Sequence, residues 1–231
     1  VDAIDWRAVF WINLPIVLLA IVLLASLTFA IIEGGERGFD VEIVWIAATI
    51  GIISGGLFIW VEQRTKDPLL DLRFFRSLPF SLATNIALLA FVAFARFLFI
   101  STLYLQNVRG LNPLHAGFAT LPLALSNAMV APVSGWMVGR FGNRLPMTIA
   151  SAMMVFSALM LIQLDESSSL LWFISAGMFM GMGLGIINAP ITNTAVSGMP
   201  VSHAGVAGAT ASTARQLGQS LGVAVLGALL N

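Results

Sequence analysis

The chain has 231 residues, of which 58% are hydrophobic and only 10% are charged. A soluble globular domain carries about a quarter charged residues, so this composition excludes an ordinary water-soluble protein and predicts a membrane protein. The eleven basic and eleven acidic side chains cancel to a net charge of +0, so nucleic acid is not an expected partner. The absence of cysteine excludes disulfides, thiolate metal sites and cysteine nucleophiles.

The spacing of the charged residues predicts an all-α, polytopic membrane protein with about seven transmembrane helices. A helix needs about 20 apolar residues to cross the hydrocarbon layer, and uncharged stretches of this size recur along the chain. The stretch between Glu166 and Arg215 is too long for one helix and is expected to break at residues 199–203, which include a proline. The predicted spans are residues 9–32, 43–61, 79–105, 113–138, 146–164, 169–195 and 204–230.

Aromatic and basic residues give the predicted spans an orientation. Rings with a polar edge favour the headgroup layer, and all six tryptophans and the single tyrosine fall near predicted helix ends: Trp6, Trp11, Trp45, Trp60, Trp136, Trp172 and Tyr104. Basic side chains gather in the linker 62–78 and the turn 139–145, which are therefore predicted to be cytoplasmic. The loop at Asp165 and the loop at Arg109 are then expected outside.

Four segments of the chain carry a resemblance to a known family. They are WRAVFWINLP at 6–15, PLLDLRFFR at 68–76, YLQNVRGLNPLHAGFATLPLAL at 104–125 and HAGVAGATASTARQLGQSLGVAVLGALL at 203–230. In this order they resemble the fourteen-helix drug/proton antiporters (EmrB/QacA-type) of the major facilitator superfamily. The resemblance implies efflux of an amphipathic small molecule in exchange for protons, by two six-helix bundles with two extra helices between them.

The resemblance also implies that the sequence is part of a longer transporter. Residues 1–78 would be the middle segment, with two transmembrane helices and a cytoplasmic linker, and residues 79–231 an incomplete C-terminal bundle of five helices. The implied partners are the lipid bilayer, the missing N-terminal helices, a small amphipathic substrate and protons, in the cell membrane and most simply a bacterial inner membrane. In members of the family, a further helix follows the segment that residues 6–15 resemble. Here Pro15 runs straight into the next family stretch, so two helices are predicted to be merged.

The acidic residues do not supply a coupling site. Proton-coupled transport usually needs a carboxylate or histidine within the membrane, whereas all eleven carboxylates lie in loops or at the ends of predicted spans. We therefore expect no transport by this chain alone. His115 and His203 are too few for a metal site, and neither a catalytic residue set nor a cofactor site is predicted, so the chain is not expected to be an enzyme. A non-transporting membrane scaffold or assembly subunit is the alternative.

Three polar residues near the middle of predicted spans are candidates for a substrate cavity: Arg96, Asn127 and Gln219. A charge at mid-bilayer costs about 2.5–3.5 kcal/mol on insertion scales, so Arg96 is expected to face either a wet cavity or polar groups of a neighbouring helix. For the two amides, hydrogen bonding between helices is the favoured interpretation.

The turn between the fourth and fifth spans resembles the superfamily's cytoplasmic GxxxDRxGxR motif through Gly135, Arg140, Gly142 and Arg144. Gly139 occupies the aspartate position, so a plain basic turn is the favoured interpretation.

Further residues are predicted to shape the helices. Pro122, Pro132 and Pro190 are expected to kink the fourth and sixth spans, and the polar residues 192–194 are candidates to bond the backbone that Pro190 frees. Glycines at 177, 181 and 185 predict close helix packing. Arg215 belongs to the last motif, with a role that the sequence leaves open.

Overall fold

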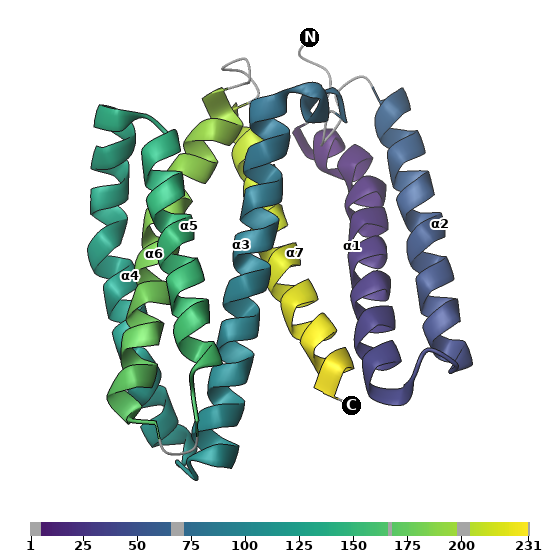
Figure 1. Ribbon diagram of the computed structural model, residues 1–231. Coiled ribbons are helices and arrows are strands. Elements are labelled where there is room, and N and C mark those ends of the chain that lie inside the picture. The colour runs from purple at the N-terminus through teal and green to yellow at the C-terminus, as the bar shows by residue number, and fades with distance from the viewer. Residues whose placement is uncertain (1–5, 66–71, 166–167, 198–203, 231) are drawn as a thin grey trace. The chain divides into compact units, whose positions relative to one another are not determined.

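The computed structural model describes residues 6–65, 72–165, 168–197 and 204–230, with side chains placed for residues 14–34, 37–65, 74–165, 168–197 and 204–225. Every regular element in these residues is helical, which confirms the predicted all-α class (Figure 1). The elements are α1 (Trp6–Arg37), α2 (Glu42–Arg64), a 3₁₀ turn η1 (Leu72–Arg76), α3 (Leu78–Leu103), a π-helical turn η2 (Tyr104–Val108), α4 (Pro113–Phe141), α5 (Arg144–Ile162), α6 (Leu170–Ser197) and α7 (Ala204–Leu230).

Six helical segments of the described chain are long and apolar enough to cross a membrane: Leu14–Gly34, Glu42–Arg64, Leu78–Val108, Pro113–Phe141, Arg144–Ile162 and Leu170–Ser197. They match the first six predicted spans to within a few residues. The seventh helix forms with the predicted bounds but is not among the six. Its first half, AGVAGATASTA, consists mainly of small and hydroxyl residues, and its membrane crossing stays a prediction.

The tryptophan prediction is confirmed where side chains are described. Trp45, Trp60, Trp136 and Trp172 all lie within a few residues of a helix end. Two of them are covered by the arginine that follows, with the Arg64 guanidinium carbon 4.3 Å from the Trp60 ring centroid and that of Arg140 5.6 Å from Trp136. Trp6, Trp11 and His203 lie outside the described side chains.

The first helix runs five residues past its predicted end at residue 32. Glu33 and Arg37 stand one turn apart and form an ion pair of 2.7 Å, a pairing that supports a helix end. Gly38 then adopts a φ of 92°, the left-handed conformation that commonly terminates a helix. The Glu33–Arg37 ion pair thus extends α1 beyond residue 32. The sequence interpretation instead takes the first charged residue as the end of the span.

Packing divides the chain into two units, residues 1–77 with 220–231 and residues 78–219. In the first unit α1 packs on α2 through glycines: a Cβ atom added to Gly51 would lie 2.7 Å from Leu27 Cδ2, and one added to Gly55 would lie 3.1 Å from Leu23 Cδ1. Glu62, close to the end of α2, is 3% exposed. The carboxylate at this span end is therefore buried, which its place in the sequence did not indicate.

The second unit is built around α6, which holds the greatest number of buried residues of the described helices. A Cβ atom on Gly181 would overlap the Leu123 carbonyl oxygen of α4, and one on Gly185 would lie 2.6 Å from the Asn127 carbonyl oxygen. Gly183 faces α5, where an added Cβ would meet Met154 Cγ at 2.6 Å. The predicted glycine packing is confirmed for Gly181 and Gly185. At Gly177 the nearest contact is an ordinary 3.7 Å.

Candidate functional site

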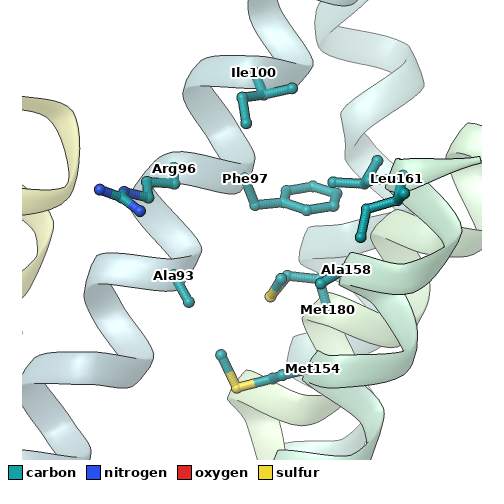
Figure 2. A pocket seen from close by; sticks show the side chains of 9 residues that line it. Ala93, Arg96, Phe97, Ile100, Met154, Ala158, Leu161 and Met180 are labelled. Atoms are coloured by element: carbon teal, nitrogen blue, oxygen red, sulfur yellow. The ribbon is translucent and has the colours of Figure 1, made fainter. Parts of the chain in front are cut away.

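A pocket of about 380 Å³ opens in the second unit between α3, α5 and α6 (Figure 2). Its walls are apolar except for one arginine. The lining residues are Ala93, Arg96, Phe97 and Ile100 of α3, Met154, Ala158, Leu161 and Ile162 of α5, and Met180 of α6. The volume lies in the range of small-molecule sites, which are mostly apolar with a few placed polar groups. The two methionines give this wall adaptable, polarisable side chains.

Arg96 borders this pocket from deep within a span. At a rise of 1.5 Å per residue it lies about 27 Å along the helix from Leu78 and about 18 Å from Val108. Its Nε atom is buried and has no hydrogen-bond partner among the described residues. Figure 2 shows the guanidinium pointing away from Phe97 and the other labelled side chains. The side chain is half-buried. Its aliphatic part lies beside the pocket, and its guanidinium group is directed away from the pocket.

The other two cavity candidates do not line this pocket. Asn127 lies on α4, where its backbone meets Gly185 of α6, and its side chain is half-buried. Gln219 is exposed on α7. A common cavity of Arg96, Asn127 and Gln219 therefore stays a prediction.

The turn between α4 and α5 is compact and is closed by Gly142. Gly142 has a φ of 74° and a ψ of −173°, and its N–H donates to the Val138 carbonyl, which closes α4. Asn143 Oδ1 accepts a hydrogen bond of 2.9 Å from Asn193 Nδ2, so the turn is tied to α6. Gly135 and Gly139 have open space where a side chain would begin, and Arg140 and Arg144 are exposed. A simple basic turn accounts for these features, although its cytoplasmic side stays a prediction.

Arg215 joins α7 to α6. Its Nη2 donates to Thr192 Oγ1 at 2.6 Å, whereas Arg215 Nε and Thr194 Oγ1 are buried with no hydrogen-bond partner among the described residues. The structure thus gives the arginine of the last motif a contact between helices.

The three prolines all lie inside helices, Pro122 and Pro132 in α4 and Pro190 in α6; the kinks expected of them stay a prediction. Pro190 removes the N–H that would bond the Ile186 carbonyl one turn back. That carbonyl accepts a hydrogen bond from Ser134 Oγ of α4. The prediction that residues 192–194 serve this purpose is wrong at this carbonyl. A serine on another helix supplies the donor, because helix packing brings it close.

A polar cluster that the sequence interpretation missed ties the α3–α4 connection to the α5–α6 loop. Arg109 Nε donates to the Tyr104 hydroxyl at 2.9 Å, and Arg109 Nη2 donates to the Ser168 carbonyl. The Tyr104 ring stacks on Phe173 with centroids 5.6 Å apart. Arg109 and the loop at Asp165 thus share one end of the unit, as the orientation argument requires. The clue in the sequence was the single tyrosine beside a motif arginine.

Comparison with known proteins places these features in a family. The Major Facilitator Superfamily matches residues 1–223. The chain is 33% identical over 261 aligned positions to the multidrug resistance protein Stp of Mycobacterium tuberculosis and 34% identical over 262 positions to the tetracenomycin C resistance and export protein of Streptomyces glaucescens. Each match covers 100% of the chain and 48% of the relative. The multidrug efflux pump LfrA of Mycolicibacterium smegmatis is 29% identical over 97% of the chain and 50% of the pump.

Two consequences follow from the extent of these matches. The chain spans about half the length of the curated relatives it matches. The alignment with Stp has 261 positions and the chain 231 residues, so at least 30 positions, 261 minus 231, face no residue of this chain. A surplus of that size equals the length of one spanning helix with a loop, and the merger of two helices near Pro15 stays a prediction. With a match over nearly its whole length, the chain belongs to the major facilitator superfamily, as its four motifs predict.

Proposed function

We propose that this chain is part of a proton-coupled secondary transporter that exports amphipathic small molecules across the bacterial cell membrane. The observation that carries the proposal is the match of the whole chain to proteins named for drug resistance and export. The membrane-spanning helices and the apolar pocket of the second unit support it.

The chain by itself is proposed not to transport. Each described carboxylate lies in a loop or within a few residues of a helix end: Glu33, Asp40, Glu42, Glu62 and Asp165. A group that gains and loses a proton within the membrane is then supplied by the helices that the relatives have in addition. The lipid bilayer and these helices are the partners of the chain.

The experiment compares the full reading frame with the 231-residue chain, each reconstituted in liposomes with a fluorescent amphipathic dye. An imposed pH gradient is expected to drive dye movement with the full frame and not with the short chain. Proton-dependent transport by the short chain would contradict the assignment of coupling to the other helices. No transport by either would favour the alternative, a membrane scaffold or assembly subunit.

A further inference from the structure

The charges of the second unit are unbalanced. Residues 78–219 contain five arginines and only two acidic residues, Asp165 and Glu166, which are neighbours in one loop. Arg109, Arg140 and Arg144 lie at helix ends and Arg215 bonds to Thr192. Arg96 alone of these five lies deep within a span without a described hydrogen bond or ion pair. The second unit therefore holds no carboxylate at the depth of Arg96.

The depth of Arg96 in the membrane limits which chemical groups can neutralise its positive charge. Its distance from both ends of the span, about 27 Å and about 18 Å, keeps it far from lipid headgroups and from the loop acids. An unpaired guanidinium in a low-dielectric region strongly favours an anion that offers two oxygen acceptors, because the planar fork donates two parallel hydrogen bonds. The bound anion must come from outside the second unit.

The pocket beside Arg96 indicates what accompanies the anionic group. Phe97, Met154, Leu161 and Met180 form walls that take up an apolar body and offer it no hydrogen bonds through their side chains. An amphipathic molecule satisfies both features at once, with its apolar part against these walls and its acid group at the arginine that borders them.

We propose that Arg96 is the recognition group for amphipathic anions, whose apolar part occupies the pocket between α3, α5 and α6 and whose carboxylate, phosphate or sulfonate pairs with the guanidinium. The inference rests on the efflux function proposed above and adds the charge of the substrate. Rotation about the flexible Arg96 stem carries the guanidinium from its position in Figure 2 to the rim of the pocket when the anion arrives.

The test uses three probes with one apolar body: pyrenebutyrate as the anion, pyrenebutanol as the neutral probe and a pyrenebutyl trimethylammonium salt as the cation. Binding to the full reading frame in nanodiscs of zwitterionic lipid is followed by pyrene fluorescence. The wild type is expected to bind the anion at least tenfold more tightly than the alcohol. Arg96→Gln removes this preference and changes alcohol binding less than about twofold. Arg96→Lys keeps part of the preference, because an ammonium retains the charge without the fork.

Arg140→Gln is the matched control, since it removes an exposed arginine at the end of α4 that does not line the pocket, and it is expected to leave all three affinities unchanged. Equal binding of the three probes by the wild type overturns the inference, and so does an equal loss for all three in Arg96→Gln, the result expected if a carboxylate of the remaining helices neutralises Arg96. If Arg96→Gln fails to fold, the wild-type preference and Arg96→Lys decide.

Transport of the same probes separates this inference from the efflux proposal. If a pH gradient moves no probe with the wild type, the efflux proposal fails. If all three move and Arg96→Gln leaves their relative rates unchanged, only the anion site is contradicted.

Discussion

The carbonyl oxygen of Ile186 lies opposite a proline that has no N–H, so its own helix cannot provide the usual donor. Ser134 of α4 donates to it instead, and both Ser134 and Pro190 are fully buried. Ser134→Ala should leave a buried acceptor without a partner. Pro190→Ala restores the missing N–H within α6, so in that background the serine becomes dispensable.

The magnitude follows from the difference between a lost hydrogen bond and an orphaned acceptor. Hydrogen bonds between membrane helices average about 0.6 kcal/mol, with a maximum near 1.7, whereas a buried unsatisfied group costs about 1–3 kcal/mol. Ser134→Ala is expected to lower the unfolding free energy by about 1–2 kcal/mol alone and by less than about 0.5 kcal/mol beside Pro190→Ala. The coupling free energy of the two changes is then about 1 kcal/mol.

Unfolding of the chain in mixed micelles, titrated with SDS and followed by far-ultraviolet circular dichroism, measures these free energies. Ser157→Ala is the matched control: its hydroxyl also donates to an α6 carbonyl, that of Ala176, at 2.6 Å, but Met180 one turn on keeps its own N–H. This change should cost about 0.6 kcal/mol in either background. Additive effects of Ser134→Ala and Pro190→Ala would refute the reasoning.

Other residues allow equally direct tests, the glycines in the same titration and Tyr104 by hydrogen exchange. Gly181→Ala forces a Cβ atom onto the α4 backbone and should destabilise by about 1–3 kcal/mol, while Gly177→Ala, one turn away with 3.7 Å of clearance, should not; equal effects would contradict the close approach. Gly142→Ala places a side chain in a backbone region that only glycine adopts readily and should cost about 1–3 kcal/mol, whereas Gly139→Ala, in open space within α4, should stabilise by about 0.5–1 kcal/mol; destabilisation at both sites would show that the turn conformation is not the cause. Tyr104→Phe keeps the ring stack and removes the hydroxyl that accepts from Arg109, so amide hydrogen exchange in the loop before α6 should quicken; unchanged exchange would show that this bond does not hold the loop.

The helices were predictable from the sequence because the membrane imposes a length on them. Charged residues about 20 positions apart mark the two ends of a span without any knowledge of the neighbouring helices. The bounds of α7 also agree with the prediction to the residue. The end of α1 was not predictable by the same argument, since Glu33 and Arg37 are charges that pair along the helix. The π-helical turn after Leu103 leaves the composition unchanged, so no pattern of apolar residues reveals it.

The candidate site was predictable only in part. Arg96 stands out because a charge in a span is rare, and this needs no knowledge of the fold. The pocket beside Arg96 depends on which faces of α5 and α6 meet α3, and the sequence does not show this. Nothing in the sequence around Met154 and Met180 distinguishes these lining residues from the other methionines of the chain. The bond of Ser134 to the carbonyl that Pro190 frees is likewise a product of packing, since the two residues belong to different helices.

The π-helical turn η2 allows this segment to absorb the loss of a single codon. Its bond from the Arg109 N–H to the Tyr104 carbonyl, 2.9 Å long, spans one residue more than an α-helical bond. Removing one residue from 105–108 would convert the turn to an ordinary α-helical turn with Arg109 in nearly the same orientation, because the deletion takes out only the extra residue. A three-nucleotide deletion here should therefore keep Arg109 on Tyr104 and Ser168, whereas a deletion in the regular part of α3 would rotate everything beyond it by about 100°.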